Sequence, residues 1–178
     1  EFETKINNNV PNHYLQAAFP TDVDAEFVYA QGQFDVVKRP IAKPDYSKYD
    51  EIPMTEQPMN SFVDICNENE GAAILNTGLK AYESDDDYNH TVYLSLLRCF
   101  ELRIYVTPEE QNYSRIENGS QSFGEHTFRY AFMPHKGDWE DAQVWKAAED
   151  FNMEILIGQT APTEHGKNPL EKSFIELE

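Results

Sequence analysis

Histidine and acidic side chains are the residues of this chain that could hold a metal ion. The run 85–89, Asp-Asp-Asp-Tyr-Asn, mimics the first half of a calcium loop, but His90 and Leu96 stand where the glycine and the bidentate glutamate are required. No histidine stands in an H-x-H, H-x-D or H-E-x-x-H pattern, so no local pair offers two ligands to one zinc ion. The five histidines are His13, His90, His126, His135 and His165. We expect a solvated acidic turn at 85–89 and no metal site in this chain, with a site assembled from distant residues as the open alternative.

Catalytic motifs are equally hard to find. There is no G-x-S-x-G elbow, no P-loop and no G-x-G-x-x-G. Cys66 and Cys99 form no C-x-x-C pair and lie in or beside expected strands, so we expect two buried free thiols. A glycosidase needs two carboxylates that face one bond, but 32 acidic residues would place pairs on any surface by chance. We therefore assign no catalytic residue to this chain.

Two tryptophans and two histidines leave functional and structural readings open. Trp139 and Trp145 could stack on sugar rings, or Trp145 could pack against the core while Trp139 anchors the start of a helix. His126 and His135 bracket a strand and a polar turn, where a histidine more often hydrogen-bonds within the fold than binds a ligand. The structural reading is favoured for all four residues.

The elements that must position these side chains read mainly as strands. Apolar residues recur with a period of two, and turn residues separate the runs. The segment 67–71 predicts a hairpin turn, 26–37 predicts one long strand with a possible bulge at Gly32, and Pro134 is expected to end the strand that carries His126. The predicted strands are 14–19, 26–37, 61–66, 72–75, 92–98, 126–132, 155–157 and 174–177. This set predicts an all-β, mainly antiparallel β-sandwich.

One helix and two long ordered loops complete the predicted architecture. Residues 139–151 place apolar side chains at helical spacing, with Asp138 as a cap. The proline-rich segment 41–59 and the segment 101–124 are expected to be ordered loops. Because strands of one type flank both loops, we expect a single β-sandwich domain over 1–178.

The charge balance narrows the possible partners. Lys and Arg total 14 against 32 Asp and Glu, which gives a net charge of -18. No basic patch is left for a phosphate backbone or an anionic membrane surface, so we expect neither nucleic acid nor membrane as a partner. The chain opens on Glu1 with no signal peptide. We expect a fragment of a longer chain, and the free cysteines favour the cytoplasm of a bacterium.

Five segments carry a resemblance to a known family. In this order along the chain they resemble the C-terminal region of family-38 glycoside hydrolases, which are retaining α-mannosidases and mannosylglycerate hydrolases. The resemblance extends from about His13 to Glu178. The segments are Phe34–Pro40, Phe62–Ile65, Gly71–Tyr82, Leu94–Arg98 and His126–Gly137.

The resemblance implies that this chain is a non-catalytic domain of a larger enzyme. The family's zinc site and aspartate nucleophile belong to an N-terminal α/β domain, and none of that apparatus matches this sequence. The implied partners are that catalytic domain and its α-mannoside substrate, with a homo-oligomer also possible. Arg98 is the candidate closest to the substrate, because family members place an arginine from this region near the sugar. Asn76 and His126 are weaker candidates, and a purely structural role is the alternative for all three.

Two other classes of function stay open. The chain could be an independent carbohydrate-binding module that holds a glycan on aromatic platforms such as Trp139. It could also be a structural or oligomer-forming domain, which is compatible with a place in a mannosidase. An H-x-D element encoded several hundred residues ahead of Glu1 would favour the enzyme domain, whereas a reading frame that starts near Glu1 would favour the module.

Overall fold

The computed structural model describes residues 1–43, 45, 47–48, 54–101, 118–153, 155, 157–159 and 173. Within this part the fold is built mainly from strands. The strands are β1 (Phe2–Asn8), β2 (Tyr14–Phe19), β3 (Phe27–Gln31), β4 (Val36–Pro40), β5 (Gln57–Pro58), β6 (Phe62–Cys66), β7 (Glu70–Asn76), β8 (Ala81–Ser84), β9 (Val92–Arg98) and β10 (Gly124–Lys136). The helices are α1 (Asn118–Gln121) and α2 (Val144–Asn152).

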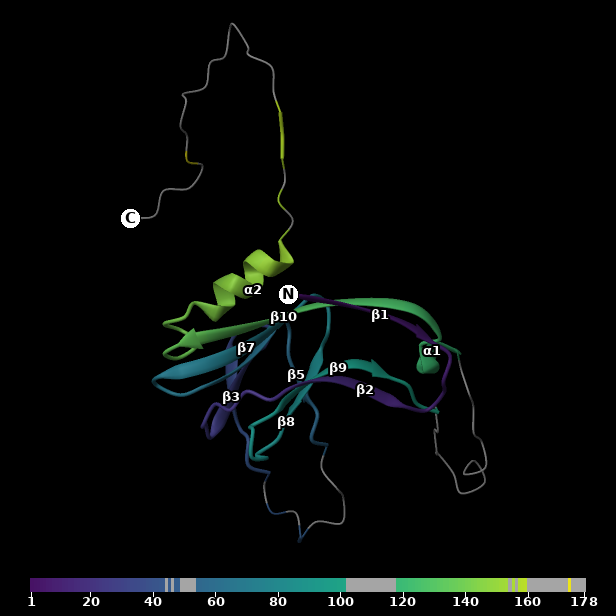
Figure 1. The fold of residues 1–178 in the computed structure, drawn as a ribbon, viewed down its shortest axis with the longest axis horizontal. Coiled ribbons are helices and arrows are strands. Elements are labelled where there is room, and N and C mark those ends of the chain that lie inside the picture. Colours follow the sequence, from purple (N-terminus) through teal and green to yellow (C-terminus); the bar gives the residue numbers. More distant parts are fainter. Residues whose placement is uncertain are drawn as a thin grey trace, which may run out of the picture.

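The strands form two antiparallel sheets (Figure 1). One sheet has six strands in the order β1-β10-β7-β6-β3-β4, and the other has four in the order β2-β9-β8-β5. Every pairing between the described strands is antiparallel. The predicted fold class, an all-β antiparallel sandwich with few helices, is confirmed.

The hairpin between β6 and β7 shows how the sequence sets the local structure. The backbone N–H of Asn67 donates to the carbonyl of Glu70 at 2.9 Å, and the Asn67 side chain accepts from the N–H groups of Asn69 and Glu70. An asparagine that accepts from the next residues is typical of tight turns. The hairpin predicted at 67–71 is therefore confirmed, and β2 and β9 begin and end at the predicted residues.

The long strand predicted at 26–37 is wrong. The chain turns back at 32–35, where the N–H of Gly32 donates to the carbonyl of Asp35 at 2.7 Å, and β3 pairs with β4 as a hairpin. Phe34 lies fully exposed at the tip of this turn. Alternating apolar residues precede and follow the turn at 32–35. The sequence pattern therefore indicated one continuous strand.

Pro134 does not end its strand as predicted. β10 pairs with β1 from Gly124 to Tyr130 and with β7 from Tyr130 to Lys136. Beyond Tyr130 the strand therefore has one partner only. Proline is tolerated there, because its missing N–H can point to the unpaired side of the sheet.

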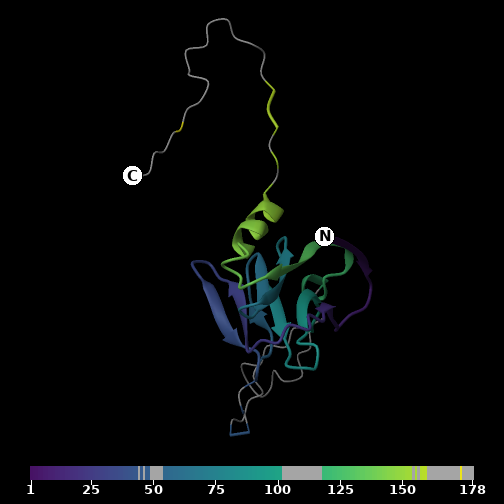
Figure 2. The same ribbon diagram turned by 60° about the vertical axis from the view of Figure 1, so that its left-hand side comes forward.

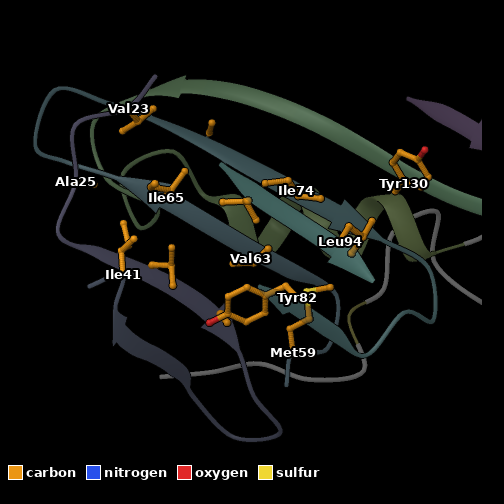
Figure 3. Packing of buried hydrophobic residues seen from close by; sticks show 14 of the residues in the cluster. Val23, Ala25, Ile41, Met59, Val63, Ile65, Ile74, Tyr82, Leu94 and Tyr130 are labelled. Carbon is orange, nitrogen blue, oxygen red and sulfur yellow. The ribbon is translucent and has the colours of Figure 1, made fainter. Parts of the chain in front are cut away.

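The main core lies between the two sheets (Figure 3). β6 contributes Val63 and Ile65, β7 contributes Ile74, and the facing sheet contributes Tyr82 and Leu94. All five side chains are almost completely buried. Burial of each such side chain stabilises the fold by about 1.5–3 kcal/mol.

A second, smaller core lies under α2 on the other face of the six-stranded sheet (Figures 1 and 2). Its buried members are Phe62 and Leu75 from the sheet and Val144 and Ala148 from the helix, together with Ala73. Because β6 and β7 are covered on both faces, they read as continuous apolar runs.

The helix begins five residues later than predicted. α2 starts at Val144, and residues 139–142 form turns in which Asp138 accepts from the N–H groups of Glu140 and Asp141. Gln143 takes a left-handed conformation with φ of 52°, which separates the turns from the helix. The prediction that Trp145 packs against the core is also wrong, since this residue is 42% exposed.

Several other predictions concern the chain termini and loops. Ile155 and Ile157 are exposed and belong to no strand, so the strand predicted at 155–157 is wrong. The strand predicted at 174–177 and most of the loop predicted at 101–124 lie outside the described residues. Strands β1, β5 and β8 were not predicted. Within the described part of the chain, no helix is long and apolar enough to cross a membrane.

Candidate functional site

A groove lies where β2 begins and β9 ends. The pairing of Tyr14 with Arg98 brings these two strand ends together, and the N–H of Cys99 donates to the carbonyl of His13 at 2.8 Å. The groove has a volume of about 440 Å³. It is lined by three short segments, 12–14, 54–56 and 98–100.

Glu56 is the centre of a hydrogen-bond network at this groove. Its Oε1 accepts from the Tyr14 hydroxyl at 2.6 Å and from Ser95 Oγ at 2.7 Å. Its Oε2 accepts from Arg98 Nη1 at 2.9 Å. The side chain is only 12% exposed, and a carboxylate so enclosed is stable only when its oxygens are satisfied in this way. The Tyr14 hydroxyl also contacts Ser95 Oγ directly.

The network keeps Tyr14 protonated. Burial, first of all, and then the hydrogen bond to Glu56 raise the pKa of the Tyr14 phenol to about 12, against a smaller lowering by the bonds with Ser95 and Gln16. At neutral pH the Tyr14 hydroxyl therefore keeps its proton and can donate a hydrogen bond to Glu56. Tyr14 itself is half-exposed, so the edge of its ring remains available to the groove.

Arg98 is the predicted substrate-proximal residue that lies in this groove. Its side chain is 57% exposed, and Glu56 is the acceptor that holds it among the described residues. A guanidinium has five N–H donors in a fixed fork, so a group fixed at one nitrogen can still bind hydroxyl or anionic groups with the others. Phe100 and Met54 are exposed apolar side chains that line the same groove.

The described residues of the groove do not include the carboxylate pair of a glycosidase. Of the described residues that line it, Glu56 is the one acidic side chain. It is committed to three donors, so it is poorly placed to act as a nucleophile or a general acid. The described arrangement can position a cation, but it does not supply the two reacting groups.

Asn76 lies away from the groove, buried at the end of β7. Its Nδ2 donates to the carbonyl of Asn60 at 3.1 Å, and its Oδ1 accepts from the N–H of Leu79 at 2.8 Å. Its backbone carbonyl accepts from Asn152 Nδ2 at 3.0 Å, which ties the end of α2 to the sheet. Asn76 thus joins three segments of the fold, and its proximity to substrate stays a prediction.

His126 lies on β10, at a third location. Its Nε2 is 2.7 Å from the carbonyl of Ser122, and its ring stacks on Phe128 with centroids 6.0 Å apart. The fold therefore does not bring the three predicted residues together, and of the three Arg98 lines the groove. The role predicted for His126 near the sugar also stays a prediction.

The other histidine of that segment, His135, belongs to a buried polar cluster under α2. Its Nε2 lies 2.8 Å from Asp64 Oδ1, and the two side chains are 4% and 0% exposed. Burial lowers the pKa of His135, but the hydrogen bond and negative charge of Asp64 raise it more, so the net direction is upward. Burial and the charge of Asp64 also raise the pKa of the neighbouring Cys66 thiol. The prediction of two buried free thiols, Cys66 and Cys99, is confirmed.

The described residues do not offer a zinc site. In residues 1–43, 54–101 and 118–153, no three or more His, Cys, Asp or Glu side chains gather where they could hold a metal ion. His165 lies outside the described residues. A zinc ion of a larger enzyme would therefore need ligands from outside these ranges.

Trp139 serves the fold. Its ring lies 6.2 Å from the ring of Tyr29 and 6.5 Å from that of Phe62, measured between centroids. It covers one end of the small core under α2. A flat platform for a sugar needs a free ring face, and this ring is packed against two others.

Sequence reasoning missed Glu56, Tyr14 and Ser95. They come from three separate segments, so no local motif contains them. The pairing of β2 with β9 brings Tyr14 close to Ser95, and Glu56 reaches both from the segment before β5. Ser95 carried a signal, because it is a small polar residue between apolar neighbours, Leu94 and Leu96, in β9.

Comparisons with known proteins identify the family. The family model described as the C-terminal domain of glycosyl hydrolases family 38 matches residues 1–101. A protein of Halalkalibacterium halodurans, provisionally named mannosylglycerate hydrolase, is 29% identical over 92% of this chain. Alpha-mannosidase 2C1 of Homo sapiens is 27% identical over 87% of this chain.

Solved structures agree with these relatives. The crystal structure of an alpha-mannosidase from Enterococcus faecalis V583 matches 84% of this chain with a TM-score of 0.69 and 28% identity. This chain spans 16% of that protein, 17% of the Halalkalibacterium relative and 13% of the human relative. The predicted resemblance is confirmed, and the chain belongs to the family of C-terminal domains of family-38 glycosyl hydrolases.

Proposed function

We propose that this chain is a non-catalytic β-sandwich domain of a zinc-dependent, retaining α-mannosidase-type hydrolase, where it supports the active site of a catalytic domain upstream. The observation that carries the proposal is the family match over residues 1–101, which includes the groove and its Arg98. In support, the described lining of the groove offers a positioned cation and no carboxylate pair. That is the chemistry of a supporting surface rather than of a complete active site.

The proposed enzyme would use two carboxylates and a zinc ion contributed by the catalytic domain. In retaining hydrolysis one carboxylate forms a covalent glycosyl intermediate and the other serves as acid and then base. Arg98 would contribute hydrogen-bond donors at the edge of that site, and Asn76 and His126 are the weaker candidates for the same role. The location proposed for the enzyme is the bacterial cytoplasm.

The test compares two proteins. One is the product of the complete reading frame that carries this sequence, and the other is the 178-residue chain alone. We expect the complete product to hydrolyse an aryl α-mannoside and to contain stoichiometric zinc by metal analysis, and we expect neither property from the chain alone. Turnover that scales with added chain, or a complete product without mannosidase activity, would overturn the proposal.

An independent carbohydrate-binding module is the second candidate. It needs an exposed aromatic platform, and Trp145 on α2, at 42% exposure, is such a side chain. The chain alone would then bind mannose oligosaccharides in a calorimetric titration, and Trp145→Ala would abolish that binding. No heat of binding at millimolar oligosaccharide would exclude the module.

A further inference from the structure

Glu56 is unusual among the acidic residues that the structure describes, because three side chains donate to it at once. Its donors are Tyr14, Ser95 and Arg98, at distances between 2.6 and 2.9 Å. An enclosed carboxylate that binds three donors is held in one orientation, since any rotation would leave buried oxygen atoms unsatisfied. Its own position is therefore fixed by the fold.

The position of Glu56 in the fold connects distant parts of the smaller sheet. Glu56 directly precedes β5, which is one edge of the four-stranded sheet, whereas Tyr14 opens β2 at the other edge. Ser95 and Arg98 belong to β9, which pairs with β2. The carboxylate thus ties the segment that enters β5 to the two strands at the opposite side of the sheet.

Arg98 depends on this carboxylate for its orientation. The side chain is 57% exposed, and in the described part of the chain no acceptor other than Glu56 meets its guanidinium. A free arginine side chain loses rotamer entropy when it is held in one conformation. An arginine that is already held loses less of this entropy when it binds a ligand.

We infer that Glu56 is a positioning residue, which acts on the enzyme's reaction only by orienting Arg98 in the groove. The inference rests on the proposed function, since it assigns the groove to the edge of the mannosidase site. Glu56 would not touch the substrate. It would hold the guanidinium by Nη1 so that the remaining N–H donors meet a hydroxyl or anionic group of the ligand in a preset geometry.

A double-mutant cycle in the complete enzyme tests this role. Glu56→Ala should lower kcat/KM for an aryl α-mannoside by about 10- to 100-fold, the loss expected from a misplaced binding group. Arg98→Ala should cause a similar loss, and Glu56→Ala should cost less than about twofold when Arg98 is already alanine. Independent, multiplying losses would overturn the positioning role, and so would full activity of either single variant.

Two control variants separate positioning from a loss of folding. Glu3→Gln removes one carboxylate from an exposed ion pair with Lys5, outside the groove, and should leave kcat/KM and the melting temperature unchanged. Glu56→Gln keeps an acceptor oxygen and should recover part of the activity lost in Glu56→Ala. A Glu56→Gln variant that melts like the wild type and yet equals Glu56→Ala in kcat/KM would show that the carboxylate charge is needed to hold Arg98.

A chemical measurement on the 178-residue chain separates this inference from the proposed function. Phenylglyoxal modifies free guanidinium groups, and mass spectrometry of peptides resolves Arg98 from Arg39 and Arg129. In Glu56→Gln, Arg98 should react about two- to fivefold faster, the range expected for loss of a half-exposed ion pair, while Arg39 and Arg129 keep their rates. An unchanged Arg98 rate would overturn the positioning role even if the complete enzyme proved to be a mannosidase.

Discussion

Single side chains decide how this sandwich responds to pH, and the pair of Asp64 and His135 is the clearest case. Both side chains are almost fully buried, and a buried charged pair is costly unless its members are matched. The folded pKa of His135 lies above its ordinary value of 6.5. The pair therefore contributes its full stability below about pH 6.5, and the contribution is lost as pH rises through the folded pKa.

The raised pKa of His135 predicts how unfolding by urea depends on pH. The free energy of unfolding of the wild-type chain should fall as pH increases from about 6 upward, because the folded state must release the proton that it binds more tightly. His135→Gln should remove this slope, since glutamine does not titrate. A slope that is the same in His135→Gln and in the wild type would show that other groups cause it.

Asp64→Asn tests the same pair from the other side. Removal of one partner of a buried charged pair typically costs about 3–5 kcal/mol, so this variant should unfold at much lower urea. Sequence analysis placed His135 in the polar turn after a strand and favoured a hydrogen-bonded structural role for it, but it did not find the partner. Asp64 lies on β6 and becomes a neighbour only through the pairing of β10, β7 and β6.

At the scale of elements, the close approach of β6, β7 and β10 depends on Gly71. A Cβ atom at this position would lie 2.3 Å from His135 Cε1 and 2.6 Å from Cys66 Cβ. Real atoms do not approach this closely, so either the imidazole or the strand must move. The ring of His135 is packed over this glycine while it bonds to Asp64.

Gly71→Ala should therefore destabilise the chain by about 1–3 kcal/mol, the usual cost of overpacking a filled site. The measurement is urea unfolding followed by tryptophan fluorescence, with Gly119→Ala as the matched control. Nothing lies within 4 Å of a Cβ at Gly119, so this second substitution should leave stability within about 0.5 kcal/mol of the wild type. Equal stability of both variants would mean that β7 shifts without cost.

Elements were predictable from the sequence where local chemistry alone sets them. The Asn67 turn and the alternation in β9 are local signals, and both strands of the β6–β7 hairpin were found. Predictions were wrong where a neighbouring strand or residue sets the local structure. Pro134 is accepted inside β10 because, among the described strands, β7 alone pairs with β10 beyond Tyr130, and residues 139–143 are turns because Gln143 is left-handed. The groove network was missed for the same reason, since the pairing of β2 with β9 assembles it.

On the scale of the whole molecule, the net charge of -18 acts on stability. Like charges repel one another more strongly in the compact fold than in the extended chain, and salt screens this repulsion. The melting temperature should therefore rise when sodium chloride is increased from about 20 mM to about 500 mM. Calorimetry of the 178-residue chain measures it. A melting temperature that falls with salt would show that attractive ion pairs, such as Arg98 with Glu56, outweigh the repulsion.

The family match and the fold differ in extent. The family model covers residues 1–101, but β10 lies beyond it and occupies the position between β1 and β7 in the larger sheet. The matched region alone would therefore leave β1 separated from the rest of its sheet. Residues 124–136 are as much a part of this domain as the matched segment.

The pairing of β1 with β10 also determines when the larger sheet can be completed during synthesis. Ile6 faces His126 across β1 and β10, so β1 leaves the ribosome well before its partner strand and cannot pair with it until β10 has been translated. Contacts between such distant residues form slowly. Until then β1 is an unpaired strand that carries two apolar side chains, Phe2 and Ile6. A nascent chain that stalls before residue 124 would expose this strand to neighbouring ribosome products, where chaperones would have to shield it.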